Sequence, residues 1–198
     1  GIKIAYPSNA ADMKGLMKAA YYDPNPVVML EHKGLYWSKV PGTEEAKTLE
    51  PSSDYVLPFG KGMVVLNASQ EAINSGETVC VITYGMGVYW AKAAARNFSG
   101  QIEIVDLRTL FPLDEDLVFS TAKKHGKCLV LTEEQQNNSF AEALAGRISK
   151  ACFQWLDAPV EVLGALNLPA VPLNMGLEAA MLPNATKLTD RLIALLSY

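Results

Sequence analysis

Apolar and polar positions divide the first 32 residues into a strand, a helix and a second strand. Apolar side chains alternate with others over residues 2–6, which is the period of a strand, and Pro7 ends the run. From residue 13 to residue 20, apolar side chains recur every three or four positions, as on one face of a helix that ends near Tyr22. A short apolar run at 27–30 lies between turn-forming residues and predicts the second strand.

The pattern changes twice along the rest of the chain. Residues 33–59 carry prolines and charges without a sustained period, which is typical of a linker or an extended crossing segment. From residue 60 onward, apolar runs typical of strands alternate with helical patterns. The apolar runs cover residues 63–66, 79–83, 102–107, 128–131 and 160–163. The helical patterns cover residues 88–98, 114–124, 139–152 and 186–196.

Strands that alternate with helices of this length predict βαβ units. We therefore expect a complete α/β domain over residues 60–198, with a mainly parallel sheet covered by helices on both faces. The βαβ fragment over residues 1–32 is too small to close a sheet by itself, and a parallel strand at the first residues needs neighbours encoded before it. We expect the chain to be a carboxy-terminal piece of a longer polypeptide.

Composition and charge narrow the function classes. The formal net charge is −4 and no run of Lys or Arg could follow a phosphate backbone, so we expect no nucleic-acid partner. No apolar run approaches the roughly 20 residues of a membrane helix, and the first residues do not resemble an export signal. These features predict a cytoplasmic protein without a membrane span. Cys80, Cys128 and Cys152 lack the spacing of zinc ligands, and we expect buried thiols.

A glycine pair after the run at 79–83 raises the alternative of a dinucleotide site. Gly85-x-Gly87 lies between a predicted strand and a predicted helix, and Asp106 follows at about the right distance for a ribose contact. Trp90 occupies the third position, where a glycine would let the helix approach the strand. We therefore favour a tight strand-to-helix turn over nucleotide binding.

Two histidines and one pair of acids are candidate chemical groups. His32 follows a predicted strand, at the end where α/β sheets often hold their sites, and is the better candidate for a direct role. His125 ends a predicted helix beside Gly126, where its imidazole would meet unpaired carbonyl groups. Glu133 and Glu134 could form a paired-carboxylate site, but neighbours on a strand point to opposite faces. We favour one interface residue and one solvated residue.

The end of the first predicted helix offers several oxygen atoms. Unpaired carbonyl groups of the helix lie there, and Asp23 and Asn25 add side-chain oxygens. Oxygens with little net charge suit a large monovalent cation. The alternative, favoured by the residues alone, is a helix that ends at a proline with Asp and Asn forming the turn.

Four segments carry a resemblance that runs nearly end to end. They read GIKIAYPSNAADMKGLMKAAYYDPNPVVMLEHKGLY, VCVITYGMGVYWAKAA, IEIVDLRTLFPLDED and HGKCLVLTEE. In order and spacing they resemble the beta subunits of thiamin-diphosphate-dependent 2-oxo acid dehydrogenases, the decarboxylating first components of the pyruvate and branched-chain complexes. DLRTLFPLD is the strongest single signature.

The resemblance implies a division of the chain. Residues 1–32 would be the end of a pyrimidine-binding domain, residues 33–59 a linker, and residues 60–198 a three-layer transketolase C-terminal-like domain. The glutamate that activates the aminopyrimidine and a histidine near the substrate would precede Gly1. We therefore expect thiamin diphosphate and magnesium in the full enzyme, no catalytic or cofactor residue in this chain, and no activity of this chain alone.

The resemblance also implies a metal site and partners. Beta subunits of this family bind a structural potassium at the end of the matching helix, so Ala20 and Asp23 would supply main-chain carbonyls and Asn25 would complete the set. The expected partners are an alpha subunit or alpha-like region, a second beta copy and the lipoyl acyltransferase core.

Two segments depart from the family pattern, and both concern the partner surface. They are residues 132–140, TEEQQNNSF, and residues 167–169, NLP. Branched-chain substrates are favoured over pyruvate on general similarity, with acetoin dehydrogenases and transketolase-like enzymes as alternatives. A non-enzymatic α/β module that only docks partners is the alternative from a different class.

Overall fold

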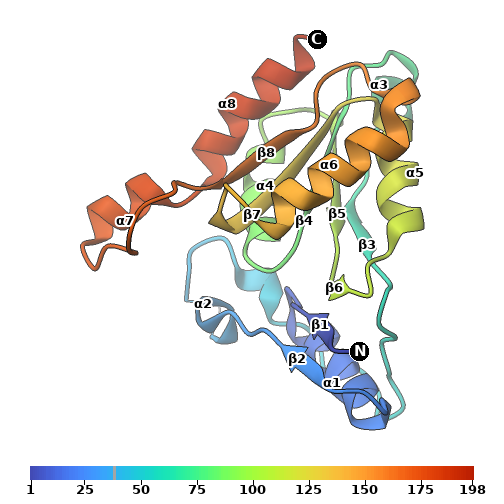
Figure 1. Ribbon diagram of the computed structural model, residues 1–198, viewed down its shortest axis with the longest axis vertical. Coiled ribbons are helices and arrows are strands. Elements are labelled where there is room, and N and C mark those ends of the chain that lie inside the picture. The colour runs from blue at the N-terminus through green and yellow to red at the C-terminus, as the bar shows by residue number, and fades with distance from the viewer. Residues whose placement is uncertain (38) are drawn as a thin grey trace.

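The computed structural model describes residues 1–37 and 39–198 and contains two sheets (Figure 1). The larger sheet has five strands in the order β3-β5-β4-β7-β8. Its strands are β3 (Met63–Leu66), β4 (Val79–Thr83), β5 (Ile102–Asp106), β7 (Cys128–Gln135) and β8 (Glu161–Ala165). Strand β4 pairs in parallel with β5 and β7, and β7 pairs in parallel with β8, whereas β3 is antiparallel to β5. The expected mainly parallel sheet is confirmed.

Helices cover both faces of the larger sheet. They are α4 (Gly87–Ala95) and α8 (Ala185–Leu196) on one face, and α5 (Glu115–His125) and α6 (Phe140–Cys152) on the other. Alternate residues of each strand supply the two cores: Val81 packs toward α4 and α8, and Ile82 toward α5 and α6. The result is the three-layer α/β arrangement visible in the upper part of Figure 1.

Local sequence explains where the long helices begin and end. The Ser139 hydroxyl accepts the backbone N–H of Glu142, and the Glu142 carboxylate accepts that of Asn138, so α6 begins with reciprocal caps at the predicted spacing. Asp114 caps α5 by accepting the N–H of Leu117. The same helix ends at Gly126, whose φ of +67° lies in the left-handed region.

The smaller sheet has the order β2-β1-β6. Strands β1 (Lys3–Ala5) and β2 (Val27–Met29) are parallel and are joined by α1 (Ala10–Tyr22), as predicted. The third strand, β6 (Thr109–Phe111), comes from the loop after β5 and runs antiparallel to β1. Leu16 of α1 and Ala5 of β1 form a small separate core with Leu57. Among the residues that the structure describes, no strand pairs with the outer edge of β2.

Short elements fill the connections. The segment between the sheets contains α2 (Lys33–Tyr36) and the 3₁₀ turn η1 (Glu44–Ala46), so part of the predicted linker is helical. Helix α3 (Gln70–Asn74), the 3₁₀ turn η2 (Phe153–Trp155) and α7 (Met175–Met181) complete the chain. Within the described residues, every helix is too short or too polar to cross a membrane.

The environment of His125 differs from the sequence expectation. His125 is the last residue of α5 and its ring is buried, with Nδ1 2.7 Å from the Thr78 hydroxyl and Nε2 3.2 Å from Glu103 Oε1. Lys124 lies 2.5 Å from the same oxygen. Burial acts to raise the pKa of Glu103, but His125 and Lys124 outweigh it and lower that pKa to about 2. The imidazole therefore pairs with a buried carboxylate and does not cap carbonyl groups.

The three cysteines are buried and unpaired, as expected. Cys80 and Cys128 face each other on β4 and β7, and Cys152 lies in the same core on α6. The hydrogen bond with the Cys128 thiol and burial raise the pKa of Cys80, which keeps it protonated.

Candidate site between the two sheets

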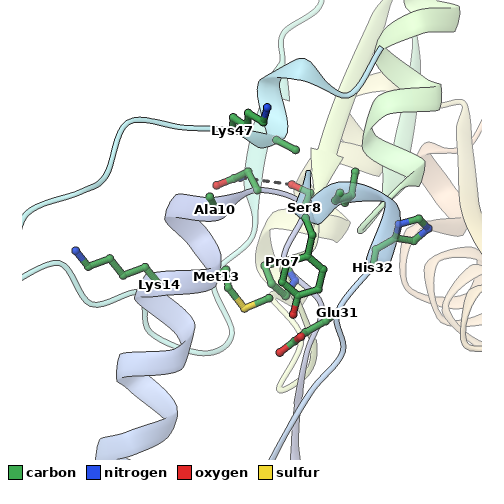
Figure 2. Close-up of a pocket in the computed structure, with 12 residues that line it drawn as sticks. Pro7, Ser8, Ala10, Met13, Lys14, Glu31, His32 and Lys47 are labelled. Carbon is green, nitrogen blue, oxygen red and sulfur yellow. Dashed lines mark hydrogen bonds between the residues drawn. The ribbon is translucent and has the colours of Figure 1, made fainter. Parts of the chain in front are cut away.

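A cavity of about 290 Å³ opens at the carboxyl ends of β1 and β2 (Figure 2). The turn between β1 and α1, including Ser8, forms one wall, and Met13 extends that wall along α1. Glu31, His32 and α2 form the opposite wall. Carboxyl ends of parallel strands are where α/β sheets usually hold ligands, so this cavity is the first candidate for a site.

His32 connects this cavity to the larger sheet. Its Nε2 lies 3.2 Å from Oε1 of Glu133, which is 101 residues away in sequence and lies on β7. The hydrogen bond with Glu133 raises the pKa of His32 above its ordinary value, and partial burial opposes this shift. The structure therefore brings together two groups that the sequence offered as separate candidates.

Glu134 points the other way, as the alternation along a strand predicts. Its carboxylate is exposed at the surface and accepts the backbone N–H of Phe140 at 2.8 Å. The Tyr84 hydroxyl lies 3.5 Å from the same oxygen and 2.7 Å from the Thr132 hydroxyl. Glu133 is thus the interface residue and Glu134 the solvent-facing one, and they do not form a paired-carboxylate site.

Asp106 fixes the β1–α1 turn to the larger sheet. Its carboxylate is fully buried, accepts the Ser8 hydroxyl at 2.5 Å and accepts the backbone N–H of Arg108 at 3.0 Å. The Tyr89 hydroxyl donates to the backbone oxygen of Ser8 at 2.7 Å. Burial raises the pKa of Asp106 to about 6, although the bonds from Ser8 and Arg108 act in the opposite direction.

Arg108 forms the second contact between the sheets. Its Nε and Nη2 donate to the two carboxylate oxygens of Asp12 at 2.8 and 2.9 Å, in the bidentate geometry that favours this pair. The backbone of Arg108 has a φ of +58°, a costly conformation for a residue with a side chain. In this conformation its carbonyl accepts the N–H of Tyr6 at 2.9 Å while its side chain reaches α1. We call Asp12, Arg108, Ser8 and Asp106 the latch.

Residue-by-residue reasoning from the sequence did not predict the latch. The DLRTLFPLD segment was recognised as a family signature, but no local pattern indicates that Asp106 and Arg108 contact residues 98 and 96 positions earlier. Asp12 resembles an ordinary acid in the first turn of a helix, and it does stand there. The available signal was the presence of two charged residues, Asp106 and Arg108, at the end of a fully buried strand.

Gly85 and Gly87 form the tight strand-to-helix turn that the sequence predicts. Gly85 has a φ of +55°, and a Cβ on Gly87 would lie 2.0 Å from the Thr83 hydroxyl, so the helix start packs directly on the strand end. Asp106 is fully buried and bonded to Ser8, which leaves it unable to contact a ribose. The dinucleotide alternative therefore has no support in the structure.

The predicted potassium ligands lie together at the end of α1. The Asp23 carboxylate forms an ion pair with Lys3 and accepts the N–H of Asn25 at 3.0 Å, and these contacts lower the pKa of Asp23. The Ala20 carbonyl accepts only a long bond, 3.3 Å, from the N–H of Asp23. The carboxylate is therefore occupied, and a cation here would depend on main-chain oxygens.

Comparison with known proteins places the fold in a family. Residues 69–188 match the model of the transketolase C-terminal domain. A solved structure described as a split gene transketolase in an inactive beta4 tetramer superposes with a TM-score of 0.69, covering 99% of this chain and 57% of that chain at 17% identity. That likeness shows the fold.

Curated relatives extend the match over both sheets. The 2-oxoisovalerate dehydrogenase subunit beta of Bacillus subtilis (strain 168) is 37% identical over 190 residues, which are 94% of this chain and 54% of the relative. The pyruvate dehydrogenase E1 component subunit beta of Rhizobium meliloti (strain 1021) is 34% identical over 96% of this chain and 38% of the relative. The chain thus spans about half of the first relative and less of the second. The family match covers most of the larger sheet and its helices, and the chain belongs to the transketolase C-terminal domain family.

Proposed function

We propose that this chain forms the C-terminal part of the beta subunit of a thiamin-diphosphate-dependent 2-oxo acid dehydrogenase with a branched-chain substrate. The observation that carries the proposal is the 37% identity to a 2-oxoisovalerate dehydrogenase subunit beta over 94% of this chain. That match is longer than the family domain, which covers residues 69–188. The whole reaction would be oxidative decarboxylation of the 2-oxo acid and acyl transfer to a lipoyl group.

In this proposal the chain holds other parts of the enzyme in place. The described residues contain no group of three or more His, Cys, Asp or Glu side chains that could bind a metal ion. At the glycine turn, a Cβ on Gly87 would lie 2.0 Å from the Thr83 hydroxyl, so the start of α4 packs closely on the end of β4. In this proposal the residues that bind thiamin diphosphate and magnesium belong to other parts of the enzyme, and we assign no catalytic step to the residues of this chain. The role of this chain in the proposal is to hold the walls of the cavity, which include the turn between β1 and α1, in place.

Exposed apolar side chains support subunit contacts. Ile2, Met17 of α1 and Val28 of β2 are about half exposed. On the segment before and within α7, Leu173 is fully exposed and Met175 is 83% exposed. Where such side chains form a contiguous patch, that patch is typical of protein interfaces. We propose the alpha subunit, a second beta copy and the acyltransferase core as partners.

Two further expectations belong to the same proposal. A structural potassium would be held by the carbonyl oxygens of Ala20 and Asp23 with Asn25. The cytoplasm is the proposed location, and the three unpaired buried thiols are consistent with a reducing compartment.

The test is an assay of the assembled enzyme. The chain is expressed with the upstream residues of its gene and with the alpha subunit, and release of carbon dioxide is measured with 2-oxoisovalerate and with pyruvate, with and without thiamin diphosphate. We expect cofactor-dependent activity with a higher kcat/KM for 2-oxoisovalerate, and no activity of this chain alone. A preference for pyruvate would overturn the substrate assignment. Lack of activity with any 2-oxo acid would favour the non-enzymatic docking module.

A further inference from the structure

The His32 ring has a hydrogen-bond partner on each nitrogen, and the two partners differ in kind. On one side the backbone N–H of Gly34 donates to Nδ1 at 3.1 Å, so His32 is the N-cap of α2. On the other side Nε2 lies 3.2 Å from Oε1 of Glu133. A Cβ on Gly34 would lie 2.9 Å from Cγ2 of Val40 and 3.0 Å from Cε1 of the imidazole, so the ring lies close to the backbone of α2.

These contacts determine the tautomer of the neutral ring. A nitrogen that accepts an N–H must carry a lone pair, so Nδ1 is unprotonated and the neutral ring carries its hydrogen on Nε2, directed at Glu133. Protonation of His32 places a second N–H on Nδ1, opposite the N–H of Gly34. The cap of α2 is then lost, while the contact with the Glu133 carboxylate becomes a charged pair.

Loss of this cap affects the cavity wall. Leu35 and Tyr36 belong to α2 and line the cavity together with His32. The helix has a single turn, and the cap holds one of its first backbone N–H groups. We propose that His32 is a pH-sensitive gate of this cavity: protonation releases the start of α2 and frees the wall formed by Leu35 and Tyr36, while it tightens the contact between His32 and Glu133.

The charged groups around His32 raise the pH at which this exchange occurs. Glu133 on β7 is the acid in direct contact, and Glu31 and Lys33 are its charged neighbours along the chain. Tyr6, which follows β1, stays neutral because burial and the Glu133 carboxylate raise its pKa to about 12. The hydrogen bond with Glu133 raises the pKa of His32, so the charged pair is present at lower pH and is lost as pH rises through the raised value.

Nuclear magnetic resonance of the protein can test both halves of the exchange. Ring nitrogen shifts report the tautomer of His32, and amide hydrogen exchange reports the opening of α2. Between about pH 5 and pH 8, where histidine titrates, we expect the Nε2–H tautomer at the high end. As His32 becomes protonated, the exchange of the α2 amides, corrected for intrinsic rates, should become roughly fivefold faster or more, as expected for loss of a helix cap. The Tyr36 ring signals should shift with the same midpoint.

Two variants separate the gate from a general effect of acid. His32→Asn keeps a side-chain oxygen that can cap α2 but does not titrate, so its α2 protection should be independent of pH. Glu133→Gln removes the carboxylate charge, so the midpoint of α2 opening should move to lower pH. An Nδ1–H tautomer at high pH, or the same pH dependence in His32→Asn as in the unchanged protein, would overturn the gate. An unchanged midpoint in Glu133→Gln would overturn the coupling to the larger sheet.

Discussion

Replacement of Arg108 by methionine should destabilise the protein by about 3 kcal/mol. The side chains of Arg108 and Asp12 are only 13% and 4% exposed, and the change leaves a carboxylate buried without its cation. Breaking a buried pair in this way costs about 3–5 kcal/mol. We place the value at the lower end because Asp12 keeps the amide of Asn9 at 2.8 Å and the hydroxyl of Tyr55 at 3.5 Å.

Urea unfolding followed by circular dichroism measures this cost. Arg147 is the matched control, because its pair with Glu115 is about half exposed on both sides, and Arg147→Met should cost about 0.5 kcal/mol. Adding Asp12→Asn to Arg108→Met removes the stranded charge, so the double variant should lose less stability than the sum of the single variants. If Arg108→Met costs no more than Arg147→Met, or if the two latch changes simply add, the reasoning about the latch is wrong.

Three further predictions concern other parts of the molecule. Burial raises the pKa of Asp106 from 3.8 to about 6, so the folded protein binds a proton that the unfolded chain releases between these values, and stability falls as pH rises across them. Asp106→Asn should remove this slope, which reaches at most ~1.4 kcal/mol per pH unit, in urea unfolding measured at a series of pH values. Gly87→Ala should lower stability by about 1–3 kcal/mol in thermal melts, because its Cβ would lie 2.0 Å from the Thr83 hydroxyl. Gly146→Ala is the control: a Cβ there lies in open space on α6, so the change should be neutral or stabilising. Replacing NaCl by KCl at equal ionic strength should raise the melting temperature, and Asn25→Ala should abolish the difference; equal melting temperatures in the two salts would count against the potassium site.

Local pattern predicted the centre of the larger sheet well because β4, β5 and the first part of β7 are buried on both faces. The runs at 79–83, 102–107 and 128–131 became β4, β5 and most of β7, and the stripe over 186–196 became α8. The orientation of β3 was not predictable in this way. A short apolar run has the same pattern in a parallel and in an antiparallel strand. The antiparallel direction is seen only in the structure, where Met63 lies opposite Asp106 and Leu66 lies opposite Ile104.

Local pattern does not predict the shortest elements, because they have too few residues to show a period. Strand β6 has three residues and is stabilised by β1, whose pairing residue Ile4 lies opposite Phe111. Helices α3 and α7 have five and seven residues, too few for a clear periodic stripe.

The contacts of the candidate site are likewise not predictable from local pattern. His32 and Glu133 were each recognised as candidates by position and residue type, but their contact depends on how the smaller sheet sits on the larger one. The sequence predicts that the first strand ends at Pro7, and no local pattern indicates that Asp106 and Arg108 contact Ser8 and Asp12. Residue type and local period can be predicted from neighbours along the chain, whereas contacts between distant segments require the assembled fold.

The position of β6 has a consequence for limited proteolysis. This strand is encoded after β5 yet completes the sheet of β1 and β2, so the predicted boundary between residues 32 and 60 does not separate the two sheets in space. A nick in the exposed stretch around Leu49 should therefore leave the two fragments associated under native conditions, through the β1–β6 pairing and the latch. The amino-terminal fragment should be released only in denaturant, and mixing the two fragments under native conditions should re-form the complex between them.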